Sequence, residues 1–183
     1  PEDFARPVSH TTRAPSPGEV HGVDYFFVPM ERMRTLIGRG LFAEHTEVDG
    51  QLYGTSHAAL KKVARSGLSC ALFVNVDGAA QLSKTNLEIK FVFVAPKSPA
   101  ALELKLRARG SETEASVRKK LRRSRTEMVV LQGESADFEH VRYADDAMEV
   151  ADELLALAAD VRPLTLSPVR VKAGLSQLGT SSG

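Results

Sequence analysis

Two long apolar runs constrain the fold of this chain most strongly, SCALFVNV at residues 69–76 and EIKFVFVAP at residues 88–96. Strands that are buried on both faces of a parallel sheet have runs of this kind, without regular alternation of polar residues. Parallel strands also need crossover connections, which are usually helices. Helical patterns occupy residues 30–40, 56–67, 99–110, 113–132 and 145–161. The sequence therefore predicts an α/β fold with a mostly parallel sheet flanked by helices.

A second set of strand patterns lies near the N-terminus. DYFFV at residues 24–28 and the segment LFAEHTEVDGQLYGTS read as short strands, with Asp49-Gly50 as the turn of a hairpin. Ser56 is a candidate N-cap for the helix that follows, and Gly67 is a candidate stop. We expect an antiparallel insert on the parallel sheet, and a weaker strand at residues 139–144.

Composition excludes several classes of function. The net charge is +1, aromatic residues make up 6% of the chain, and Trp is absent, which argues against nucleic-acid binding. No apolar run reaches the length of a membrane span. Cys70 is the single cysteine and lies in an apolar run, so we expect a buried thiol and a location in the cytoplasm or another reducing intracellular compartment. The five histidines have no metal-ligand spacing, and we expect no metal site.

The segment SHTTRAPSPGEVHGVDYFFV is too polar for a core and suits an anion. Arg13 and the neighbouring hydroxyl groups can bind an oxyanion, and Tyr25 and Tyr53 can donate phenol hydrogen bonds to it. Glu44, on an expected strand, can accept from adjacent N–H groups of a ligand. From the residues alone, a solvated loop with a capping glutamate remains an open alternative.

Three segments in order, SHTTRAPSPGEVHGVDYFFV, FAEHTEVDGQLYGTS and LRARGSETEASVRKKL, resemble signatures of the guanylate kinase family. The resemblance spans residues 4–161, nearly the whole chain. It implies a P-loop kinase fold with a GMP-binding insert and a helical lid, and transfer of a phosphoryl group from ATP to GMP. We expect a guanylate-kinase-like domain at residues 1–162, with the insert at about 20–56 and the lid at about 105–130.

By position, the resemblance assigns GMP binding to six residues: Ser9, Arg13, Tyr25, Glu44, Tyr53 and Thr55. Arg13 and the two tyrosines would contact the phosphate. Glu44 would accept from guanine N1–H and the 2-amino group, a pair of donors that adenine does not offer. In the lid, Lys105, Arg109 and Lys120 stand at positions that contact phosphates. The basic run RKKLRRSR, residues 118–125, belongs to this lid helix and is expected to face solvent or phosphate.

The departures from the family pattern concern its chemistry. Four positions lack the family's functional residue: Ser16, Phe73, Asn75 and Ala144. Ser16 replaces a second phosphate arginine, and Phe73 and Asn75 replace an acid-x-acid pattern. Lys105 and Lys120 keep charge where the family has arginines, but lose bidentate geometry. These changes predict impaired catalysis, with no catalytic residues of the family pattern retained at those four positions.

The family's glycine-rich loop, GxxxxGK[ST], and its central strand would precede Pro1. We expect Mg-ATP binding only if that loop is supplied by further sequence. Residues 163–183 are either a flexible tail or the relic of a strand plus P-loop, possibly the start of a following repeat. In the second case Gly174 and Gly179 are its glycines, followed by Thr180 and Ser181.

Three functions remain open on these grounds. The chain is expected to be a catalytically inactive module that binds protein partners or neighbouring domains of a larger protein, or a module that binds GMP without phosphoryl transfer. The alternative is an active guanylate kinase, converting ATP and GMP to ADP and GDP, whose P-loop lies on further sequence.

Overall fold

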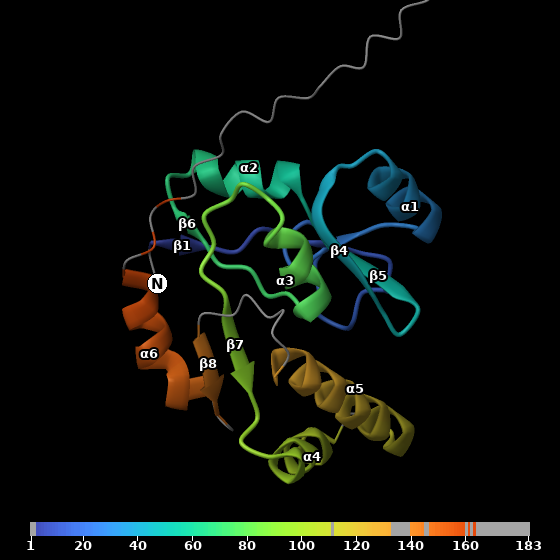
Figure 1. Cartoon of the computed structure of the whole chain (residues 1–183). Helices are drawn as coiled ribbons and strands as arrows, with labels where there is room; N and C mark the ends of the chain where they lie inside the picture. Colours follow the sequence, from blue (N-terminus) through green and yellow to red (C-terminus); the bar gives the residue numbers. More distant parts are fainter. Residues whose placement is uncertain are drawn as a thin grey trace, which may run out of the picture.

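The computed structural model describes residues 3–110, 112–132, 140–144, 147–159, 161 and 163. Its helices are α1 (Met30–Gly38), α2 (His57–Arg65), α3 (Val76–Leu82), α4 (Pro99–Ala108), α5 (Glu114–Gln132) and α6 (Ala147–Ala159). Its strands are β1 (Phe4–Ala5), β2 (His10–Thr11), β3 (Phe26–Phe27), β4 (Phe42–Val48), β5 (Gln51–Ser56), β6 (Ser69–Cys70), β7 (Val92–Ala95) and β8 (His140–Tyr143). Figure 1 shows β1 to β6 with α1 to α3 in one part of the molecule, and α4 and α5 in another.

Strands β3, β2, β5 and β4 form one four-stranded sheet in that order. The hairpin β4–β5 turns at Asp49 and Gly50, whose φ angles of 56° and 74° are those of a two-residue turn with positive φ. The predicted hairpin is therefore confirmed. The sheet is mixed rather than wholly antiparallel, because β2 pairs parallel with β3 and antiparallel with β5. It also begins earlier than the expected insert, since His10 and Thr11 contribute a strand.

Parallel pairing is confirmed in two separate ladders, β1 with β6 and β7 with β8. The expected strand at residues 69–76 was too long, because β6 covers only Ser69–Cys70. The N–H of Ala71 still donates to the carbonyl of Ala5, at 3.1 Å. Farther along, the neighbouring segment reaches Pro7, which has no N–H to donate. Similarly, β7 is limited to Val92–Ala95 within the predicted 88–96.

Helix α3 was missed by the sequence analysis. Asn75, assigned to the end of a strand, is the N-cap of this helix, and its Oδ1 accepts from Gly78 N at 2.9 Å. Asp77 in the first turn complements the helix dipole. The helix is hydrogen-bonded to the middle of β4. Gln81 Oε1 accepts from His45 N, and Gln81 Nε2 donates to His45 O. These bonds fix α3 beside Glu44.

The remaining helices agree with the predictions. Ser56 caps α2, accepting from Ala59 N at 3.2 Å, and Gly67 follows that helix with φ of 72°. Leu60, Leu82 and Ala43 form a buried core cluster against which Leu72 and Val74 pack. Burial raises the pKa of the Cys70 thiol to about 11, so it stays protonated near neutral pH, as expected of a structural cysteine. No helix within the described residues is long and apolar enough to cross a membrane.

Candidate functional site

A cleft of about 160 Å³ lies where the four-stranded sheet, the loop before α3 and helix α5 meet. Its lining residues are Ser9, Tyr25, Glu44, Thr46, Val48, Tyr53, Gly54, Phe73, Val74, Asn75 and Arg123. Four of the six residues predicted to bind GMP are therefore brought to one cleft. The other two, Arg13 and Thr55, are not lining residues but contact residues that are, Tyr25 and Ser9 respectively.

Glu44 is the buried acid of this cleft, with 4% of its surface exposed. It lies on β4 beside an irregularity in the pairing with β5, opposite Thr55. Burial raises the pKa of the Glu44 carboxyl, while hydrogen bonds to Thr55 oppose that rise in pKa. Gly78 leaves room for this carboxylate, because a Cβ there would lie 3.0 Å from Glu44 Oε2. A buried carboxylate in a cleft is suited to accept from two adjacent N–H donors.

Hydroxyl groups line the cleft beside this acid. The hydroxyl oxygens of Ser9 and Thr55 lie 3.0 Å apart, which links the segment before β2 to β5. The rings of Tyr25 and Tyr53 stack edge to face, with centroids 6.2 Å apart. The two phenols thus come from different parts of the chain to one wall of the cleft, as an anion site would require.

Arg13 lies next to these tyrosines but is held by its own loop. Its Nη1 donates to Ser16 Oγ at 2.9 Å and to the carbonyl of Ala14, and its Nη2 donates to Glu19 Oε1 at 2.7 Å. This pairing lowers the pKa of Glu19. The guanidinium carbon lies 5.7 Å from the centroid of the Tyr25 ring. Ser16, one of the four positions predicted to depart from the family pattern, therefore serves as an acceptor for Arg13.

Phe73 and Asn75 both line the cleft but offer little to a metal ion. Phe73 is 84% exposed, and its side chain carries no oxygen. The side chain of Asn75 is used locally, since Oδ1 accepts from Gly78 and Nδ2 donates to Thr46 Oγ1 at 2.9 Å. Mg²⁺ prefers carboxylate and other oxygen ligands, so these two positions do not fit the magnesium role of an acid-x-acid pattern. Within the described residues no group of three or more His, Cys, Asp or Glu is arranged to hold a metal ion.

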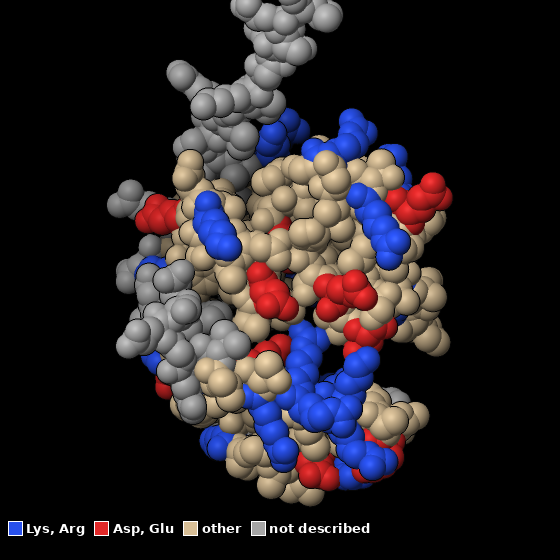
Figure 2. Space-filling model, turned by 45° about the vertical axis from the view of Figure 1, so that its right-hand side comes forward, with Lys and Arg blue, Asp and Glu red and all other residues tan. Residues whose placement is uncertain are grey.

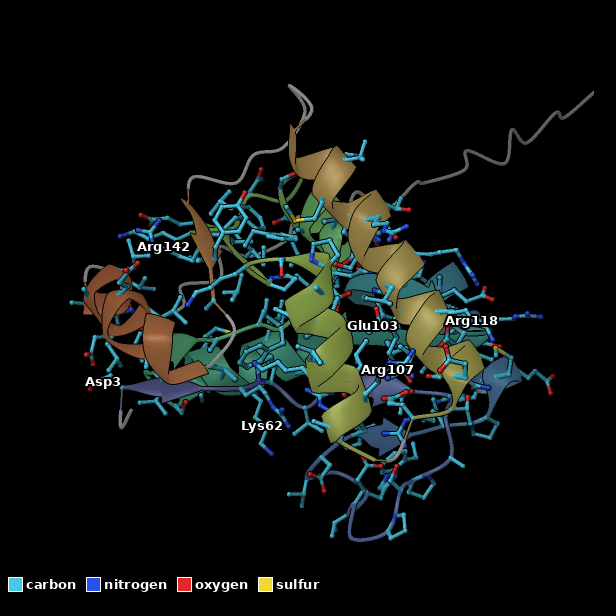
Figure 3. All side chains as sticks on the ribbon, turned by 90° about the horizontal axis from the view of Figure 1, so that it is seen from below. Asp3, Lys62, Glu103, Arg107, Arg118 and Arg142 are labelled. Carbon is cyan, nitrogen blue, oxygen red and sulfur yellow. The ribbon has the colours of Figure 1, made fainter. Side chains whose placement is uncertain are left out.

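The predicted lid, at about residues 105–130, falls on the end of α4 and on most of α5, and these two helices lie side by side in Figure 3. Arg107 joins them, pairing with Glu103 on α4 at 2.8 Å and with Glu114 on α5 at 2.7 Å. Three cations were predicted for the lid, Lys105, Arg109 and Lys120. None of them is among the described residues that line the cleft. Lys120 instead pairs with Glu112, whose pKa it lowers.

Arg123 of α5 lines the cleft and was not singled out from the sequence. The basic run at residues 118–125 predicted a charged surface on this helix, but it did not indicate which of its cations faces the sheet. In Figure 2, Lys and Arg side chains of the part that holds α4 and α5 face Asp and Glu side chains of the other part across a hollow. One such contact is the ion pair of Lys119 Nζ with Asp49 Oδ1, at 2.6 Å.

Of the remaining predicted positions, Ala144 is described by the structure and does not line the cleft. Ala144 follows β8, is 9% exposed, and its N–H donates to the carbonyl of Ala95 at 2.8 Å. Its role is to extend the β7–β8 pairing. The suggested P-loop relic, comprising Gly174, Gly179, Thr180 and Ser181, lies outside the described residues.

Comparison with known proteins agrees with this geometry. The family model described as guanylate kinase matches residues 1–157. The chain is 45% identical to a guanylate kinase of Sus scrofa over 68% of its length and 63% of the relative. It is 39% identical to guanylate kinase 1 of Oryza sativa subsp. japonica over 87% of its length and 42% of the relative. The chain thus spans less than two thirds of the length of these relatives.

A solved structure has the same fold. The guanylate kinase from Anaplasma phagocytophilum superposes with a TM-score of 0.67 and 28% identity, covering 86% of this chain and 76% of that one. The α/β architecture predicted from the two apolar runs is therefore confirmed.

Proposed function

The chain belongs to the guanylate kinase family, and we propose that it binds GMP in the cleft around Glu44. The observation that carries the proposal is the buried carboxylate of Glu44 in a cleft that also holds Tyr25 and Tyr53. Guanine N1–H and its 2-amino group would donate to the carboxylate, and the phenols would donate to the phosphate. Adenine presents an acceptor at N1 and would be rejected.

We further propose that this chain does not transfer phosphoryl groups by itself and acts as a binding module toward a protein partner or a neighbouring domain. Support comes from Phe73 and Asn75, which stand where the family pattern has acids and which offer no carboxylate. Asn75 caps a helix instead, a structural use of the position.

A second candidate, guanylate kinase activity completed by another segment, is favoured by a different observation. The ladders β1–β6 and β7–β8 are both parallel and are not hydrogen-bonded to each other within the described residues. A further strand paired between β6 and β7 would join them into one sheet and could bring a glycine-rich loop with it.

The test of the first proposal is calorimetric titration of the 183-residue chain with GMP, with AMP as the control ligand, after circular dichroism confirms folding. We expect GMP to bind and AMP not to bind. Glu44→Gln should weaken GMP binding about tenfold or more, since the negative charge is lost and one of the two acceptor oxygens is replaced by an NH2 donor. Glu47→Gln, an exposed change on the same strand, is the matched control. Equal binding of GMP and AMP would contradict the proposal.

Coupled-enzyme assay of ADP release from ATP and GMP separates the two candidates. The assay is run on the chain joined to a strand and glycine-rich loop of the family pattern, and the binding module predicts no turnover above background even then. Turnover that requires both nucleotides would instead establish the kinase candidate.

A further inference from the structure

We propose that Arg123 of helix α5 binds the phosphate group of the nucleotide in this cleft, in place of the second phosphate arginine, whose position is Ser16. The inference rests on the proposed binding of GMP and names the residue that completes its anion site. Arg123 is a cation among the lining residues of the cleft, in which Glu44 is the acid.

The placement of α5 supports this role. Lys119 pairs with Asp49 at the turn of the β4–β5 hairpin, at 2.6 Å. Arg123 lies four residues later on the same face of the helix. It therefore reaches the cleft beside Val48 and Tyr53, which belong to the same hairpin. Lys119 thus contacts the turn of the hairpin, and Arg123, about one helical turn later, lines the cleft.

Arg13 and Arg123 also differ in the hydrogen bonds that their terminal nitrogens make. The terminal nitrogens of Arg13 already donate to Ala14, Ser16 and Glu19. Arg123 donates through Nε to Glu127 Oε1 at 2.9 Å. Its two terminal nitrogens make no hydrogen bond to another residue in the described part of the chain, and 39% of the side chain is exposed. The guanidinium is therefore oriented by Glu127 and keeps its outer donors for a ligand, which is the geometry that bidentate phosphate binding needs.

Charge decides which part of a nucleotide Arg123 would meet. The phosphate would avoid the carboxylate of Glu44, because like charges repel strongly in a partly buried site. The phenols of Tyr25 and Tyr53 mark the other wall of the cleft, and Tyr53 is shared with the hairpin that Arg123 approaches. The phosphate would lie between the phenols and Arg123, with the base directed to Glu44.

The experiment compares GMP with guanosine, which has the same base and no phosphate, by calorimetry on the full chain. Arg123→Gln should weaken GMP binding about tenfold, the usual effect of losing a charge-assisted hydrogen bond, and should leave guanosine binding unchanged. Arg123→Lys should restore part of the affinity, because charge is kept and the bidentate geometry is lost. Arg125→Gln, an exposed residue of the same helix that does not line the cleft, should change neither affinity.

Two results would overturn the inference while leaving the proposed function intact. The first is unchanged GMP affinity in Arg123→Gln. The second is an equal loss for GMP and guanosine, which would assign Arg123 a structural role. Failure of the unmodified, folded chain to bind GMP would instead overturn the proposed function, and this inference with it.

Discussion

Gly54 is the position where the candidate cleft is most sensitive to a single methyl group. It lies on β5 opposite His45, and it lines the cleft. A Cβ added at Gly54 would lie 2.8 Å from the carbonyl oxygen of Glu44, 2.9 Å from Phe42 Cδ1 and 3.0 Å from His45 Cβ. All three distances are shorter than ordinary van der Waals contacts, and the shortest is to backbone of the paired strand, which cannot rotate away.

Gly54→Ala should therefore force β4 and β5 apart where Glu44 is positioned. Overpacking of this kind costs about 1–3 kcal/mol of the free energy of unfolding. In a domain of this size, each 1 kcal/mol lowers Tm by roughly 2–4 °C. The variant should also bind GMP more weakly, because the carbonyl of Glu44 must move. Urea denaturation followed by circular dichroism measures the first effect, and calorimetry measures the second.

Gly38→Ala is the matched control for this substitution. A Cβ at Gly38, the last residue of α1, would meet no atom within 4 Å. Alanine there should leave stability unchanged or raise it by up to about 1 kcal/mol, since glycine is a poor helix former. If Gly54→Ala were as stable as the parent chain, or if both variants lost the same stability, the argument from close contact would be refuted.

Three further substitutions test other parts of the structure. Ser56→Ala should lower the free energy of unfolding by about 1 kcal/mol in urea denaturation, because the N-cap bond to Ala59 N is lost; an unchanged midpoint would contradict this. Asn75→Asp should favour GMP over IMP in calorimetry, since a carboxylate can accept from the 2-amino group that only guanine carries and aspartate still caps α3; an equal change for both ligands would argue against it. Guanosine affinity should fall as pH is lowered through the raised pKa of Glu44, starting above pH 4.5, and this pH dependence should vanish in Glu44→Gln; persistence of the dependence in the variant would exclude Glu44 as its source.

Local signals were sufficient for much of this fold. The Asp49-Gly50 turn, the Ser56 cap and the stop at Gly67 depend on residues within a few positions of one another, and all were predicted. Helix α3 also carries such signals, with Asn75 as cap and Asp77 in the first turn. The prediction instead extended a strand through residues 69–76, because a short apolar run does not by itself distinguish a strand from other buried structure.

The length of β6 depended on a distant segment and was beyond local reasoning. Its partner is β1, and that pairing stops where Pro7 removes a donor. No residue within the run at 69–76 indicates where this pairing ends. The side chains nevertheless alternate as a strand would place them, with Leu72 and Val74 against the core and Phe73 exposed.

The residues that line the candidate cleft were likewise predicted only in part. Ser9, Tyr25, Glu44 and Tyr53 could be predicted because their order matches a known family pattern. Arg123 could not, since the rotation of α5 about its axis is set by contacts such as Lys119 with Asp49, on another element. A basic run places charge on a helix, but only the packing of that helix selects the residue that enters a site.

The burial of Glu44 predicts that a carboxylate placed here for a ligand lowers the stability of the unliganded chain. An ionised carboxylate that is 4% exposed is destabilising unless partners replace its water, and desolvation is the largest influence on its pKa. Because the pKa is raised in the folded state, the folded chain binds protons more tightly than the unfolded chain. Stability should then fall as pH rises from about 4.5, the unfolded value, through the folded pKa.

Glu44→Gln stays neutral at every pH in that window and has nearly the same volume. We therefore expect the variant to unfold at a higher urea concentration than the parent at pH 7.5, and the difference to shrink toward pH 4.5. Guanine binding should be weakened in the same variant, because the amide is neutral and keeps only one acceptor oxygen. A variant less stable than the parent at pH 7.5 would mean that the carboxylate is already satisfied by the protein, and that its burial is structural rather than a preparation for guanine.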